Sequence, residues 1–140
     1  MLLALGTGIF ERLTDHSGSP QEQATRLLSL LFPPAVVAAM GQEVVDIVAA
    51  ARAELSPAGL EAQERVLAAW HRTEPPSPPS DPPIPVLVVH GEEDVVLPPA
   101  NAAALGARWP GARVELFAGG GHAFMAQEPQ RLAERIVSFL

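Results

Sequence analysis

Three apolar runs along the chain predict a small parallel sheet. Residues 86–89, V-L-V-V, stand between Pro85 and Gly91, and such a continuous run is typical of a strand buried on both faces. Residues 113–117, R-V-E-L-F, begin with an alternation of polar and apolar side chains, which predicts an edge strand with one wet face. Residues 2–5 form a third run that predicts another buried strand, with a frayed apolar N-terminus as the alternative.

Apolar positions three and four residues apart predict amphipathic helices elsewhere in the chain. The clearest of these helices begins at Ser19, which caps it, and Glu22 completes a capping box. Pro33 ends that helix, and Gly41 is a candidate break in the next one. The predicted helices cover about residues 20–32, 35–55, 57–72, 99–108 and 129–140.

Residues 74–85 read E-P-P-S-P-P-S-D-P-P-I-P and separate the helices from the strand at residues 86–89. Proline fixes the backbone φ angle and cannot donate to a strand ladder. The segment is therefore predicted to be an extended, polyproline-like connector. Its P-x-x-P pattern also occurs in peptide ligands of SH3 domains, but its position between predicted elements favours the connector.

Two residues with catalytic potential follow consecutive predicted strands. Asp94 comes just after the strand at residues 86–89, and His122 follows three glycines after the strand at residues 113–117. The carboxyl ends of neighbouring parallel strands meet at one edge of the sheet, where ligand sites gather. A carboxylate beside an imidazole fixes the tautomer of the ring and stabilises its charged form. Taken alone, Asp94 is better explained as a residue that caps its own turn, and an isolated loop histidine is usually just solvated.

The segments H-G-E-E-D-V-V-L-P, P-G-A-R-V-E-L-F and G-G-G-H, together with the closing helix, resemble the C-terminal part of α/β-hydrolases. In that family the acid follows the seventh strand as G-x-x-D and the histidine follows the eighth, so the resemblance assigns these positions to Asp94 and His122. It implies that His122 is a general base and then a general acid, oriented by Asp94. The resemblance is strong over residues 84–140 and weaker upstream.

By this resemblance the fold class is α/β, a partial α/β-hydrolase fold of about three parallel strands with flanking helices and a helical cap insertion. The chain would be one incomplete domain. Its parts would be residues 1–10 (the sixth strand), 11–74 (the cap), 75–85 (the linker) and 86–140 (the C-terminal segment). Because the cap covers the active site in this family, the candidate substrate-binding residues are Phe32, Met40, Trp70 and Phe124, although core packing is the favoured role of the first three.

The nucleophile of the family is absent from this sequence. α/β-Hydrolases carry it on a G-x-S-x-G elbow after the fifth strand, and no G-x-S-x-G occurs here. Ser17, Ser19 and Ser138 are poor substitutes: Ser19 is better explained as a helix cap, and Ser138 lies in the last predicted helix. The backbone groups of the oxyanion hole also belong to parts of the fold outside this sequence.

Two classes of function therefore fit the sequence. In the first, the chain is the C-terminal part of a hydrolase that cleaves an ester or a related bond of a small-molecule substrate, and it is inactive on its own. In the second, it is a non-catalytic remnant that acts as an interaction or oligomerising module. The predicted strand at residues 2–5 would expose an unpaired edge, which a longer parent chain, a complementing chain or a second copy would cover. The longer parent chain is favoured.

Composition argues against several other classes. A net charge of −7 without a basic cluster argues against nucleic acid or an anionic membrane as a partner. The absence of cysteine rules out disulfides and thiolate metal sites, and no apolar run approaches the ~20 residues that span a bilayer. No cofactor is expected, and metal binding by His90 with Asp94 and His122 is a minor hypothesis. The N-terminus lacks the pattern of a signal peptide, so the expected location is the cytoplasm.

Overall fold

Two parallel strands form the sheet in the computed structural model, which describes residues 5–70 and 84–140. They are β1 (Leu87–Gly91) and β2 (Arg113–Phe117), paired in register from Leu87 with Arg113 to Gly91 with Phe117. Both lie where the apolar runs predict them. The predicted strand at residues 2–5 and the linker at residues 75–85 lie outside the described residues, except for Leu5, Ile84 and Pro85, which are in no strand or helix.

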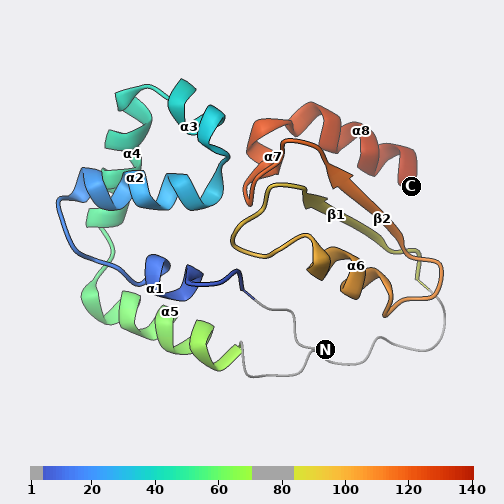
Figure 1. Ribbon diagram of the computed structural model, residues 1–140, viewed down its shortest axis with the longest axis horizontal. Helices are drawn as coiled ribbons and strands as arrows, with labels where there is room; N and C mark the ends of the chain where they lie inside the picture. The colour runs from blue at the N-terminus through green and yellow to red at the C-terminus, as the bar shows by residue number, and fades with distance from the viewer. Residues whose placement is uncertain (1–4, 71–83) are drawn as a thin grey trace.

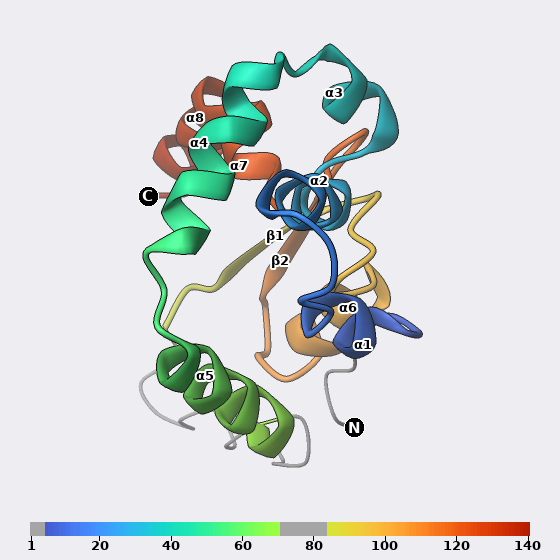
Figure 2. The ribbon, with the colours of Figure 1, turned by 90° about the vertical axis from the view of Figure 1, so that its left-hand side faces the viewer.

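A helix covers each face of this sheet (Figures 1 and 2). The helices around the sheet are α6 (Ala100–Gly106), α7 (Phe124–Gln127) and α8 (Pro129–Phe139). The chain crosses from β1 to β2 through α6, which packs on both strands and approaches Val114 closely at Gly106. On the opposite face, α8 places the Arg131 guanidinium 4.6 Å from the centre of the Phe117 ring.

The structure corrects the wet face predicted for β2. Glu115 forms ion pairs with Arg113 and with Arg135 of α8, whose Nε atom lies 3.4 Å from the carboxylate. Val114 and Leu116, the apolar residues of the alternation, are exposed together with Arg113, while Glu115 is half-buried. The pattern misleads here because α8, which supplies the cation for Glu115, is distant in sequence.

The helices described before the sheet are α1 (Ile9–Leu13), α2 (Pro20–Leu31), α3 (Pro34–Ala39), α4 (Gln42–Ala53) and α5 (Pro57–Trp70). The predicted capping box is confirmed: the Ser19 hydroxyl accepts from the Glu22 amide, and the Glu22 carboxylate accepts from the Ser19 amide. The helical stretch predicted at residues 35–55 is divided at the predicted candidate break, because Met40 is extended and Gly41 is the N-cap of the second helix. No helix among the described residues is long and apolar enough to cross a membrane.

One hydrophobic cluster holds the first two helices beside the carboxyl end of β1. Ile9 of α1, Leu30 of α2 and Val96 pack together and are buried. The amide of Gly6 also donates to the carbonyl of Val96, at 2.9 Å. Burial of an aliphatic side chain contributes about 1.5–3 kcal/mol. The cluster therefore fixes α1 and α2 close to the residues that follow β1.

Candidate active site

Asp94 and His122 meet at the carboxyl edge of the sheet. Asp94 lies on the loop at residues 92–99 after β1, named the acid loop below, and His122 on the loop at residues 118–123 after β2, named the histidine loop. The Nδ1 atom of His122 is 2.9 Å from the Oδ2 atom of Asp94. Parallel pairing explains this contact, because it brings the ends of β1 and β2 to the same edge.

Asp94 is a buried carboxylate, only 5% exposed, and both of its oxygens have partners. The Oδ1 atom accepts hydrogen bonds from the amides of Val96 (2.8 Å) and Leu97 (2.9 Å), while the Oδ2 atom faces His122. Burial acts to raise the pKa of Asp94, but the hydrogen bonds from His122, Leu97 and Val96 and the charge attraction of His122 together lower it below its usual value. Asp94 is therefore ionised at neutral pH. It caps its turn with one oxygen and binds the imidazole with the other.

His122 directs one ring nitrogen at Asp94 and leaves the other without a bond to any described residue. Because an ionised carboxylate only accepts, the Nδ1 atom carries the hydrogen of this contact. In the neutral ring the Nε2 atom then holds a lone pair. The His122 side chain is 34% exposed, so Nε2 is not sealed in the core. An imidazole oriented in this way accepts a proton at Nε2 and is stabilised by Asp94 as it becomes charged.

His90, on β1, is a second imidazole close to Asp94. Its Nε2 atom lies 2.7 Å from the carbonyl oxygen of Leu97 and 3.3 Å from the Oδ2 atom of Asp94. A carbonyl only accepts, so this nitrogen carries a hydrogen and has no lone pair for a metal. No cluster of three or more histidines, cysteines, aspartates or glutamates that could hold a metal ion is present in residues 5–70 and 84–140. The position of His90 instead ties the acid loop to β1.

The acid loop and the histidine loop touch backbone to backbone. The Glu92 amide donates to the Phe117 carbonyl (2.9 Å), and the Glu93 amide donates to the Gly120 carbonyl (2.8 Å). A side chain at Gly91 would overlap the carbonyl oxygens of Gly120 and Gly121. Position 91 therefore requires glycine for a steric reason that is independent of catalysis. The absence of a side chain there lets the two loops approach until Asp94 reaches His122.

We expect Gly91→Ala to lower the free energy of unfolding by about 1–3 kcal/mol, or more, because the overlapping atoms are backbone and cannot rotate away. Urea unfolding followed by circular dichroism measures the change. Gly41→Ala is the matched control, since a methyl group there meets no atom within 4 Å. Equal stability of the two variants would show that the loops do not approach each other as described.

Further contacts hold the histidine loop, and no sequence pattern pointed to them. The Oε1 atom of Gln127 accepts from the Gly121 amide (2.8 Å), and its Nε2 atom donates to the Gly119 carbonyl (3.1 Å). The Ala123 amide donates to the Leu31 carbonyl at the end of α2, at 2.9 Å. Gln127 belongs to no motif, and it reaches the loop only because the glycine-rich turn folds back toward α7. The loop that carries His122 is thus fixed from both sides.

A cleft of about 360 Å³ opens beside Asp94. Arg12 and Ser29 line it from the helical side, and Glu92 and Glu93 line it from the acid loop. Of the four predicted substrate-binding residues, Phe32 lines this cleft. The cleft therefore gives a small molecule space beside Asp94, while His122 is not among its lining residues.

The other three predicted substrate-binding residues lie elsewhere. Met40 ends α3 and is half-buried, and it does not line the cleft. Trp70 is 49% exposed and lines a separate groove on α5. Phe124 is buried, with its ring centre 4.9 Å from that of Phe117, so it packs in the core. The structure does not bring these three residues to Asp94, and their part in substrate binding stays a prediction.

A parallel sheet with a helix on each face and an acid–histidine pair at its carboxyl edge places the chain in the α/β class. The sequence profile of the alpha/beta hydrolase family matches residues 4–135. The chain therefore belongs to the alpha/beta hydrolase family. The resemblance to this family that was inferred from the sequence is therefore confirmed.

The chain is also similar to two solved structures of variants of CumD, a meta-cleavage product hydrolase. The first is 19% identical, with a TM-score of 0.69 over 97% of this chain and 50% of that chain. The second, from Pseudomonas fluorescens IP01 and complexed with acetates, is 18% identical, with a TM-score of 0.70 over 99% of this chain and 51% of that chain. The chain thus spans about half the length of both structures. No curated protein sequence matches it.

Proposed function

We propose that this chain supplies the acid and the general base of a hydrolase that cleaves an ester or a related bond by a nucleophile–histidine–acid mechanism. His122 is the base and then the acid of the reaction, and Asp94 orients and stabilises it. The nucleophile and the oxyanion hole belong to the N-terminal part of the fold, which these 140 residues do not include.

The contact between Asp94 and His122 carries this proposal. When the nucleophile attacks the carbonyl carbon, its hydroxyl proton moves to the Nε2 atom of His122. The Nδ1 hydrogen stays in its bond to the ionised Asp94, which stabilises the imidazolium. The same proton then passes from Nε2 to the leaving group, so the ring returns to its neutral form. A water molecule repeats the cycle to release the acyl group.

This chain covers only about half the length of the two solved structures. That coverage supports the proposal that the nucleophile lies outside these 140 residues. Among the described residues β1 pairs with β2 alone, and no described strand lies at its other edge. An open edge of this kind is where additional strands of a sheet join. The proposed complete enzyme therefore extends the sheet beyond β1, with the nucleophile elbow on one of the added strands.

The proposed substrate is a small molecule that enters the cleft beside Asp94, with the helices α2 to α5 acting as a cap. The contact of the histidine loop with the end of α2 supports this role, because it sets these helices against the proposed catalytic residues. The solved relatives are described as meta-cleavage product hydrolases, which supports hydrolytic chemistry on this fold. The fold alone does not select the bond that is cleaved.

The proposal is tested on the chain expressed together with the residues that are encoded in frame before Met1. We expect a G-x-S-x-G about 25–30 residues upstream and hydrolysis of p-nitrophenyl acetate. Asp94→Asn should lower kcat about 10⁴-fold, because an amide facing Nδ1 favours the wrong tautomer of His122. Asp46→Asn, an exposed carboxylate on α4, is the control. Equal kcat values for the two variants would contradict the role of Asp94, and a stop codon directly upstream would favour a non-catalytic module.

A further inference from the structure

A second cavity, of about 280 Å³, lies on the helical side of the molecule, and none of the residues around Asp94 lines it. It is bounded by the loop between α1 and α2, by the end of α4 and by α5. Its apolar wall is made of Leu13, Leu27, Leu55, Leu60 and Leu67. The cavity has the volume of about nine molecules of liquid water, so it suits a small ligand with an apolar part.

Arg52 of α4 lines this cavity and has no partner in it. Its Nε atom is buried and forms no hydrogen bond, and the structure gives its guanidinium no ion pair with any described residue. Arg52 as a whole is half-buried, and a buried nitrogen atom without a hydrogen bond is uncommon in native proteins. A ligand oxygen in the cavity would supply the acceptor that this Nε atom lacks among the described residues.

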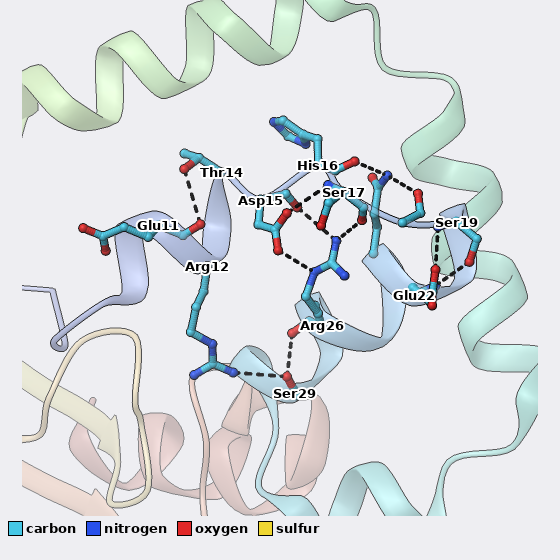
Figure 3. A network of polar contacts seen from close by, with 12 residues as sticks. Glu11, Arg12, Thr14, Asp15, His16, Ser17, Ser19, Glu22, Arg26 and Ser29 are labelled. Carbon is cyan, nitrogen blue, oxygen red and sulfur yellow. Dashed lines mark hydrogen bonds and ion pairs between the residues drawn. The ribbon is translucent and has the colours of Figure 1, made fainter.

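Glu64, which also lines this cavity, and Asp15 each have another partner. The Nε2 atom of His16 lies 2.6 Å from the Oε1 atom of Glu64, across the mouth between the loop and α5. Asp15 accepts from the Ser17 amide and pairs with the Nε atom of Arg26 at 3.4 Å. Figure 3 shows the contacts of Asp15 with Ser17 and Arg26, with the ring of His16 projecting away from the Arg26 guanidinium. Among the described residues, neither Glu64 nor Asp15 forms an ion pair with Arg52.

We propose that this cavity binds a small amphipathic carboxylate, with its alkyl chain against the leucines and its carboxylate on Arg52. A guanidinium suits this head group, because its planar fork donates two parallel hydrogen bonds to the two carboxylate oxygens. The leucines account for the apolar part of the ligand and the unpaired cation accounts for its charge. The site depends on no residue of the acid loop or the histidine loop, so it stands apart from the proposed catalytic function.

The test uses hexanoate, hexan-1-ol and hexylammonium, which share one alkyl chain and differ in the charge of the head group. Each is titrated into the 140-residue chain, and binding is followed by the methyl resonances of the lining leucines. We expect hexanoate to bind at least about tenfold more tightly than hexan-1-ol, because a charged hydrogen-bonded pair is added. Hexylammonium should bind most weakly. Tighter binding of hexylammonium, equal binding of all three or no binding of hexanoate would overturn the proposal.

Variants of Arg52 separate the head-group contact from the cavity itself. In Arg52→Gln the preference for hexanoate over hexan-1-ol should disappear, while Arg65→Gln, an exposed arginine of α5 outside the cavity, should keep it. Arg52→Lys keeps the charge and should retain the preference in part, which gives a readout even where the Gln variant folds poorly. An unchanged preference in Arg52→Gln would show that another group, and not Arg52, selects the carboxylate.

Discussion

The 140-residue chain alone is expected to hydrolyse p-nitrophenyl acetate no faster than buffer. It contains no G-x-S-x-G, and a triad hydrolase that loses its nucleophile loses about 10⁶ in kcat. Initial rates of ester hydrolysis with and without the purified chain measure this directly. Turnover that is present in the chain and lost in His122→Ala would contradict the expectation.

Such turnover would require a nucleophile within the chain, and the structure identifies the serine to examine first. Ser29 lines the cleft beside Asp94. Its hydroxyl donates to the Arg26 carbonyl at 2.7 Å, as is common for a helical serine, and accepts from Arg12 of α1 at 3.4 Å. Ser29→Ala would remove the activity if this serine were the nucleophile, and would leave it unchanged otherwise.

The second large effect is expected in the protein extended by its upstream residues. There His122→Ala should lower kcat about 10⁶-fold, with a smaller change in KM, because the proton acceptor of the attack is lost and the cleft remains. Steady-state kinetics with p-nitrophenyl acetate separate the two constants. Met125→Ala, a nearby exposed side chain of α7, is the control and should keep the activity of the parent protein.

A fall in kcat of less than tenfold in His122→Ala would show that another group takes the proton. His90 is the imidazole to examine in that case, because it lies 3.3 Å from the same carboxylate oxygen. Its Nε2 atom already donates to the Leu97 carbonyl, however, so we expect His122, and not His90, to accept the proton. The bond between His90 and the Leu97 carbonyl would have to break before this nitrogen could accept a proton.

The sequence predicted the elements that depend on neighbouring residues. The run at residues 86–89 gave β1 within two residues, and the box formed by Ser19 and Glu22 gave the start of α2. Both signals are local, because a continuous apolar run and a cap act through residues close in sequence. The covered face of β2 was not predictable in this way, since the arginine that pairs with Glu115 comes from α8.

The residues of the candidate site also fall into two groups: those that the sequence identified and those that only the structure revealed. Asp94 and His122 stood out from their positions after two predicted strands, and the alpha/beta hydrolase family was recognisable from the segments around them. The contribution of Gln127 was not recognisable, because a glutamine in a short helix matches no motif. The unbonded Nε atom of Arg52 was not recognisable from the sequence either. Whether this atom has a partner among the described residues depends on how the surrounding helices pack.

The sequence by itself determined which chemical groups this protein carries and the order in which they follow its strands. Only the tertiary structure decided that an acid and an imidazole 28 residues apart lie 2.9 Å from each other, and that their loops close because position 91 has no side chain. It also decided which charges are paired and which are left alone. The physical reason is that hydrogen bonds and ion pairs act over a few ångströms, and strand pairing and helix packing, rather than distance along the chain, set which groups come that close.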